Sequence, residues 1–255
     1  MEFRAIARLG RFKDVIASLL RHGFDDLVQR LELPGMDLVR KWTHSDSQVG
    51  TYERIRHVLE DLGPTFVKFG QIMSLRPDLL PPPLIEELSR LQDDVATEEF
   101  SAIQQVVEKQ LGRPLKEVFT IFDVTPLAGA SLSQVHRGVL RKEGWIVSVK
   151  IQRPGIRKKI RTDLDILAAI AHRLHERSEE LRFYDLPNLV RVTRRNLLRE
   201  LDFKREARNM KIARSYAFDN PIHIPEPYED YCTEGLLIME YVQGTKLKDM
   251  DHSQL

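Results

Sequence analysis

One lysine of the sequence, Lys150, lies within an apolar run, Val147-Ser-Val-Lys-Ile151. Successive side chains of an extended strand point to opposite faces, so Ser148 and Lys150 face away from the two valines. A lysine in such a strand can hold the α- and β-phosphates of a nucleotide. A lysine that protects a sheet edge from pairing is the alternative interpretation, and the strand alone does not decide between them.

A run of small residues precedes this strand, within Pro126-Leu-Ala-Gly-Ala-Ser-Leu-Ser-Gln-Val-His136. The small-residue loop consists of Ala128, Gly129, Ala130 and Ser131. Because these side chains are short or missing, the backbone can approach a bulky ligand and turn its amide groups toward phosphate oxygens. A plain hairpin of small residues is the alternative.

Three carboxylates follow farther along the chain, at Glu200, Asp202 and Glu206. We expect all three inside one long helix, where Asp202 and Glu206 share a face and Glu200 lies on another. Carboxylates that point in several directions can serve several cations, and Lys150 is the natural partner for one of them. A solvated helix face, balanced by neighbouring basic residues, is the alternative.

An apolar run that turns polar, Leu236-Leu-Ile-Met-Glu-Tyr-Val-Gln-Gly244, comes last. In a protein kinase such a segment joins the two lobes, and its backbone, here Glu240 to Val242, bonds the adenine edge. A buried strand that ends in a turn is the alternative. The small-residue loop, strand lysine, helix glutamate and hinge-like strand occur in the order of a kinase small lobe, and this order favours a nucleotide site.

The elements that position these residues fall into two groups. Amphipathic or proline-started helices are expected at residues 1–30, from about 52, from Pro64, at 84–91 and at 98–111 with Gly112 as the cap. Strands are expected near 118–124, 133–140, 145–151 and 236–242, and another apolar run follows Pro221. Two further helices are expected, from about 156 to 174 and from Pro187 to about 217. This grouping predicts an α+β fold with an antiparallel sheet. We expect a helical N-terminal extension, residues 1–115, and a sheet domain, residues 116–255.

Composition and charge exclude several classes of protein. The chain of 255 residues has a net charge of +1, which gives no reason to expect a nucleic-acid partner. Its one cysteine, Cys232, rules out an internal disulfide and a cysteine-based zinc cluster. No stretch approaches the roughly 20 apolar residues that span a bilayer. The first 30 residues form a basic amphipathic pattern, which suits either the surface of an anionic membrane or an ordinary solvated helix.

Residues 52–244 resemble the UbiB/AarF family of atypical kinase-like proteins. The most specific match is Lys68-Phe-Gly-Gln71, the Lys-x-Gly-Gln motif of that family, which includes Gly70. The small-residue loop resembles the family's alanine-rich loop, with Gly129 where alanine is common. The segment Val149-Lys-Ile-Gln-Arg-Pro-Gly155 resembles the family's third strand, and Glu200-x-Asp202 its Glu-x-Asp motif. Missing glycine-rich and Walker-type loops disfavour an ordinary serine/threonine kinase and a P-loop enzyme.

The resemblance implies roles for these residues. Lys150 would contact the α- and β-phosphates of ATP, and Glu206 would orient Lys150. The small-residue loop would cover the phosphates, and the backbone at Glu240 and Val242 would hold adenine. By the same resemblance, the helices that carry Lys68, Gly70 and Gln71 would gate the nucleotide site. They would do so by folding over it and meeting Glu200 and Asp202.

For the full-length parent, the resemblance implies an ATP-dependent ATPase or phosphotransferase that supports ubiquinone or related isoprenoid-lipid biosynthesis. Its partners would be Mg-ATP and a lipid or isoprenoid-quinone precursor, and it would act on the cytoplasmic face, peripheral to the inner membrane. The catalytic loop and the Asp-Phe-Gly site that binds Mg²⁺ are expected beyond Leu255, so we expect no metal ligand in this kinase-like small lobe and no turnover by it alone. A non-catalytic helical scaffold or membrane-surface regulator is the alternative.

Overall fold

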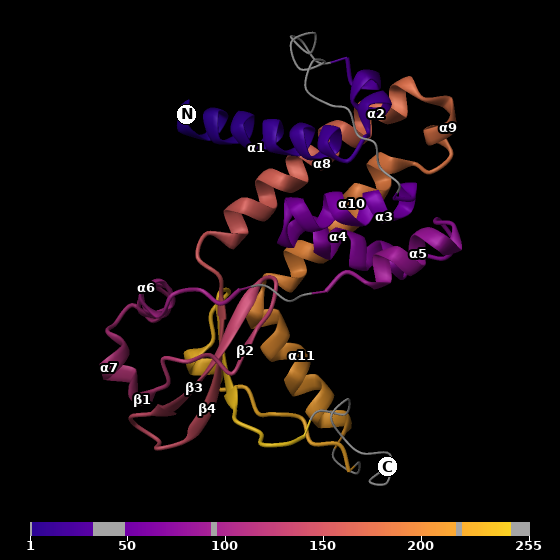
Figure 1. Cartoon of the computed structure of the whole chain (residues 1–255). Coiled ribbons are helices and arrows are strands. Elements are labelled where there is room, and N and C mark those ends of the chain that lie inside the picture. Colours follow the sequence, from indigo (N-terminus) through magenta and orange to yellow (C-terminus); the bar gives the residue numbers. More distant parts are fainter. Residues whose placement is uncertain (1, 33–48, 93–95, 218–220, 246–255) are drawn as a thin grey trace. The chain divides into compact units, whose positions relative to one another are not determined.

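The structure, a computed structural model, describes residues 2–32, 49–92, 96–217 and 221–245 (Figure 1). The chain divides into two compact units. The helical unit comprises Met1–Val95 and Gly155–Arg199, and the sheet unit comprises Ala96–Pro154 and Glu200–Leu255. Each unit therefore combines two stretches that are far apart in the sequence.

The helical unit takes its name from its helices. Those within the described residues are α1 (Glu2–Arg21), α2 (Asp25–Arg30), α3 (Thr51–Leu62), α4 (Pro64–Ser74), α5 (Pro82–Ser89), α8 (Ile156–Arg177), α9 (Glu179–Arg182) and α10 (Leu186–Glu200). The start of α4 at Pro64 confirms the prediction, since proline suits the first helical position. The same preference begins α5 at Pro82, two residues before the predicted start. The single helix predicted over residues 1–30 is wrong, because Gly23, with φ of 73°, separates α1 from α2.

Apolar stripes hold these helices together. Phe66 of α4 is buried against Val15 of α1, Val58 of α3 and Ile166 of α8. A second cluster joins α4 to α5 and consists of Val67, Met73, Leu88 and Leu91. Burial of large apolar side chains on facing stripes is the main source of stability for helices of this length. No helix in the described part of the chain is long and apolar enough to cross a membrane.

The sheet unit contains an antiparallel sheet with helices on both faces. Its elements are α6 (Phe100–Leu111), α7 (Leu115–Val118), β1 (Phe119–Phe122), β2 (Ala128–Gly129), β3 (Ser133–Leu140), β4 (Ile146–Gln152), α11 (Phe203–Tyr216), the short 3-10 helix η2 (Glu229–Tyr231) and β5 (Leu236–Glu240). The strands lie in the order β1-β3-β4-β5, and β2 pairs with the other end of β3. The predicted α+β class with an antiparallel sheet is confirmed. The apolar run after Pro221 forms only an isolated bridge, between Pro227 and Met239.

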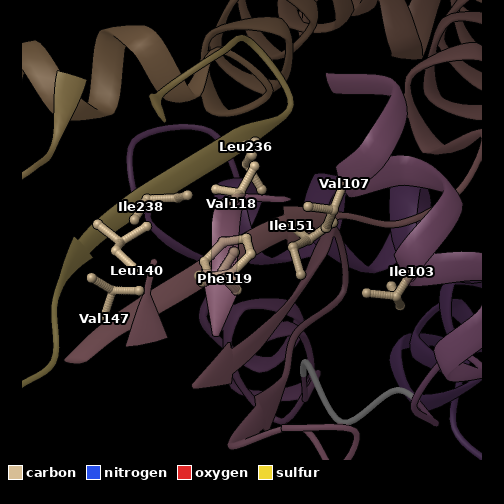
Figure 2. Close-up of a cluster of buried hydrophobic side chains, with 10 residues drawn as sticks. Ile103, Val107, Val118, Phe119, Leu140, Val147, Ile151, Leu236 and Ile238 are labelled. Atoms are coloured by element: carbon tan, nitrogen blue, oxygen red, sulfur yellow. The ribbon is translucent and has the colours of Figure 1, made fainter. Parts of the chain in front are cut away.

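Alternation along β4 and β5 builds the core. Val147, Val149 and Ile151 of β4 face α6 together with Leu236 and Ile238 of β5. Figure 2 shows side chains from α6, α7 and four strands converging in this cluster. Leu237 points to the opposite face, where it packs against Phe203 and Ala207 of α11. Lys150 and the other alternate residues of β4 therefore lie on this opposite face of the sheet, as the alternation predicts.

The long helix predicted from Pro187 to about residue 217 is wrong. It ends at Glu200, and α11 begins at Phe203 after a break. Asp202 adopts an extended backbone, with φ of −105° and ψ of 90°, and its carboxylate accepts a hydrogen bond from the backbone N–H of Arg205. Aspartate is a favoured N-cap because it satisfies a donor that the first turn leaves without a partner. Asp202 and Glu206 therefore do not stack along one helix face.

Candidate nucleotide-binding site

The polar face of β4 carries an ion pair with α11. Lys150 Nζ lies 2.7 and 2.9 Å from the two carboxylate oxygens of Glu206. The ammonium group also lies 4.9 Å from the centre of the Phe203 ring. Both charged side chains are partly exposed, and a pair of this kind contributes only about 0–1 kcal/mol to stability. Its chief consequence is geometric, because it holds the lysine head group at a defined place on the sheet.

Helix α11 presents Glu206 from its first turn. The cap at Asp202 begins the helix, and Phe203 donates its backbone N–H to the carbonyl oxygen of Glu234 at 3.1 Å. Phe203 and Ala207 are each 2% exposed and face the sheet, which directs Glu206 toward Lys150. The pairing of Lys150 with Glu206 is thus part of the packed structure, while the roles assigned to these two residues stay predictions.

The small-residue loop forms a hairpin with β3. Ala128 and Gly129 pair with Val135 and Gln134, and the N–H of Ala130 donates to the carbonyl oxygen of Ser133 at 2.9 Å. Ala128 and Gly129 are exposed, whereas Ser131 is 2% exposed. A ligand could therefore approach the small-residue loop at Ala128 and Gly129, while the buried Ser131 fixes the loop to the sheet. The function of the loop as a phosphate cover is still a prediction.

Two buried polar side chains on β3 lie behind this hairpin, and sequence reasoning missed their importance. His136 Nδ1 lies 2.8 Å from the carbonyl oxygen of Asp123, and its Nε2 lies 2.9 Å from the amide nitrogen of Gln134. Since a carbonyl can only accept, Nδ1 carries the proton and Nε2 accepts from Gln134. Burial lowers the pKa of His136, which favours this neutral form. Gln134 in turn accepts the N–H of Glu98 at 2.8 Å.

The end of β5 holds the residues predicted to bind adenine. The N–H of Glu240 donates to the carbonyl oxygen of Glu226 at 2.8 Å. The carboxylate of Glu240 lies 3.1 Å from Nε2 of His223 and accepts the N–H of Glu226 at 3.1 Å. Val242 is 46% exposed and follows the strand. The side chain of Glu240 is therefore engaged by the segment before η2, and adenine contacts at Glu240 and Val242 stay a backbone prediction.

The predicted gating motif lies on α4, and its glycine has a packing role that the sequence did not reveal. A Cβ atom on Gly70 would lie 2.3 Å from Leu91 Cδ1 and 2.8 Å from Leu59 Cδ1. The side-chain amide of Gln71 donates to the carbonyl oxygen of Leu91 at 3.1 Å. Lys68 lies on the same helix and is partly buried. These three residues belong to the helical unit and Glu200 and Asp202 to the sheet unit, so their meeting stays a prediction.

No three or more His, Cys, Asp or Glu side chains among the described residues lie together in an arrangement that could hold a metal ion. The Lys150–Glu206 pair supplies one cation and one carboxylate, and that carboxylate is already engaged. What this arrangement can do chemically is bind and orient an anion beside the sheet.

Comparison with known proteins places the chain in a family. Residues 90–254 match the model of the ABC1 atypical kinase-like domain. A protein of Vibrio cholerae serotype O1 (strain M66-2) named "Probable protein kinase UbiB" is 34% identical over 252 residues, which cover 96% of this chain and 46% of that protein. The protein of the same name from Erwinia tasmaniensis is 36% identical over 251 residues, covering 95% of this chain and 46% of that protein.

A solved structure has a similar fold. The structure of the Rv3197–erythromycin complex from Mycobacterium tuberculosis matches with a TM-score of 0.50 and 28% identity, over 75% of this chain and 48% of that one. The chain spans about half the length of the curated relatives it matches. The family model alone covers more than half of the present chain, and the UbiB-named relatives cover nearly all of it. The chain therefore belongs to the family of ABC1 atypical kinase-like domains.

Proposed function

We propose that the sheet unit binds ATP, with Lys150 at the α- and β-phosphates. The observation that carries this proposal is the Lys150–Glu206 ion pair on the polar face of β4, with both oxygens of Glu206 within 2.9 Å of the ammonium group. A lysine held by a helix glutamate is the arrangement that kinases use to position nucleotide phosphates. Family membership supports the same assignment.

The remaining parts of the site follow from this placement. The small-residue loop covers the phosphates, since β2 pairs with β3 and β3 pairs with β4. The backbone at Glu240 and Val242 holds adenine, because β5 is the direct neighbour of β4. Lys68 and Gln71 gate access together with Glu200 and Asp202. Mg²⁺ accompanies ATP as its counterion, with protein ligands outside the described residues.

For the whole protein we propose an ATP-dependent phosphotransferase or ATPase that supports ubiquinone or related isoprenoid-lipid biosynthesis. The relatives named as probable protein kinases support phosphoryl transfer, and the family resemblance of the sequence supports the lipid-linked role. A lipid or quinone precursor as second substrate, and contact of α1 with the cytoplasmic face of a membrane, belong to this proposal.

The test is Mg-ATP binding by calorimetry to the chain and to Lys150→Ala. We expect the variant to bind at least tenfold more weakly, a loss of about 1.4 kcal/mol. Lys142→Ala is the matched control, because Lys142 lies exposed in the turn between β3 and β4 and should leave binding unchanged. Equal binding by the chain and by Lys150→Ala would remove the role given to Lys150.

A further inference from the structure

Two consecutive polar residues at the end of β4, Gln152 and Arg153, are almost fully buried. Gln152 is 7% exposed and Arg153 is 6% exposed. Gln152 lies two residues after Lys150, so both side chains point to the face of the sheet that α11 covers. Burial of such long polar side chains is unfavourable unless hydrogen bonds satisfy them. Their partners therefore show what they hold in place.

The amide of Gln152 bonds to the segment that begins α11. Its Nε2 donates to the carbonyl oxygen of Leu201, in the break between α10 and α11, and to that of Glu234 at 2.9 Å. The same Glu234 carbonyl accepts the N–H of Phe203, the first residue of α11. Gln152 thus ties the start of the helix to β4 and to the turn before β5. Glu206 lies in the first turn of that helix, so its position depends on this anchor.

The guanidinium group of Arg153 bonds in another direction. Its Nε donates to the carbonyl oxygen of Ala130, in the small-residue loop, at 2.9 Å. One terminal nitrogen, Nη1, donates to the carbonyl oxygen of Ala96 at 2.7 Å and to the carboxylate of Glu98 at 2.9 Å. These bonds use two nitrogen atoms of the rigid guanidinium plane, whereas a lysine has one nitrogen, which cannot lie at both places. Arg153 thus fixes the loop to the chain segment that precedes α6.

We propose that Gln152 and Arg153 are positioning residues that assemble the nucleotide site before the nucleotide arrives. Gln152 holds the helix that carries Glu206 against Lys150, and Arg153 holds the small-residue loop over the place of the phosphates. The inference rests on the proposed function, because it assigns two further residues to the same site. A site that is already ordered binds its ligand more tightly, since less conformational freedom is lost on binding.

The experiment on Arg153 compares Arg153→Lys with the control Arg141→Lys. Arg141 also donates to two backbone carbonyl oxygens, those of Lys116 and Phe119, but away from the loop. Without nucleotide, we expect amide hydrogen exchange at residues 128–131 to be about tenfold faster in Arg153→Lys and unchanged in Arg141→Lys. ATP should bind about tenfold more weakly to Arg153→Lys. Adenosine, which lacks phosphates, should bind equally to both variants and to the unchanged chain.

The Gln152 arm tests coupling to Glu206. Gln152→Met keeps the length of the side chain but removes its donor, and Gln104→Met is the control, because the Gln104 amide donates to the Glu108 side chain within α6. We expect faster exchange at residues 203–206 in Gln152→Met alone. We also expect Glu206→Gln to weaken ATP binding in the unchanged chain. When Gln152→Met is already present, the same change should weaken binding by less than about twofold, because the effects of mutations in one network do not add.

Two outcomes would overturn the inference. The first is loop exchange in Arg153→Lys equal to that of the unchanged chain. The second is full additivity of Gln152→Met and Glu206→Gln, with exchange at residues 203–206 unaffected. If Gln152→Met does not fold, Gln152→Asn, which draws the amide back by one methylene, gives the same comparison. Failure of the unchanged chain to bind ATP would instead reject the proposed function, while the exchange measurements would still decide whether these residues position the loop and helix.

Discussion

The two units of the chain differ in how far their buried polar side chains are hydrogen-bonded. Those of the sheet unit include Gln134, His136, Gln152 and Arg153, which hydrogen-bond to backbone or to one another. In the helical unit the described residues include three buried hydroxyls without a hydrogen-bond partner, those of Ser18, Thr65 and Thr193. Asp163, which pairs with Arg11, is a buried charge among the described residues of that unit.

This difference shows how each unit holds its shape. The helices satisfy their own backbone, so their side chains have mainly to pack, and packing is not directional. The loops of the sheet unit have no ladder of their own, and buried side chains provide the bonds that fix them. One of those loops, the small-residue loop, belongs to the candidate site. We therefore expect the helical unit to respond most to changes of shape and the sheet unit to respond most to the loss of single hydrogen bonds.

The largest expected effect is in the helical unit, at Gly70. We expect Gly70→Val to lower the free energy of unfolding by about 2–3 kcal/mol, because the new side chain would overlap Leu91 and Leu59. Gly10→Val is the matched control, since Gly10 is also helical and a Cβ atom added there would have nothing within 4 Å. Chemical denaturation measures both. A tolerated Gly70→Val would break the comparison, because close packing would then not decide the shape of this unit.

A smaller effect is expected at the cap of α11. Asp202→Ala should cost about 1 kcal/mol, because the backbone N–H of Arg205 loses its carboxylate acceptor and keeps the carbonyl oxygen of residue 202, at 3.0 Å. Asp202→Asn keeps an acceptor at the same place and should stay close to the unchanged chain. Hydrogen exchange in the first turn of α11, followed together with denaturation, locates the loss. If both variants lost the same stability, the charge of Asp202 and not its hydrogen bond would be what matters.

The smallest effect is a pH dependence that belongs to the sheet unit. The pKa of His136 is lowered by burial below the value of about 6.5 that it has in the unfolded chain. Below about pH 6.5 the unfolded state therefore binds a proton that the folded state does not, and the free energy of unfolding falls until the pH passes the folded pKa. His136→Gln should lose less stability than the unchanged chain between about pH 7.5 and about pH 5.5. A slope in His136→Gln equal to that of the unchanged chain would show that the burial of His136 does not cause the pH dependence.

Sequence patterns predicted the strands better than the connections between them. Alternation located β3 at residues 133–140 and placed Lys150 opposite the valines of β4, since the pleat follows from local geometry. The break before Phe203 was not predictable in this way, because helix-forming residues continue through it. Asp202 and the bond of Phe203 to Glu234 decide it. Gly70 likewise shows its importance only once Leu59 and Leu91 are near it in space.

The same limit applies to the candidate site. Order along the chain and the family resemblance brought Lys150 and Glu206 together as expected partners. Nothing local indicates that Gln152 bonds to a carbonyl 82 residues away or Arg153 to one 57 residues away. Such residues look like the polar end of a strand in the sequence. Contacts of this kind depend on the complete topology of the sheet unit, which single-sequence patterns do not contain.

The backbone passes between the units at three places: after Val95, after Pro154 and after Arg199. Gln152 and Arg153 lie just before the second crossing, and their bonds reach Leu201 beside the third and Ala96 beside the first. On the sheet side, the hydrogen bonds of these two neighbouring residues therefore connect all three crossing segments. After a protease cut at one crossing, the hydrogen bonds of Gln152 and Arg153 would still hold the segments at the other two crossings to the sheet unit. For protein engineering, a short linker from residue 154 to residue 200 would close the sheet unit into a continuous chain.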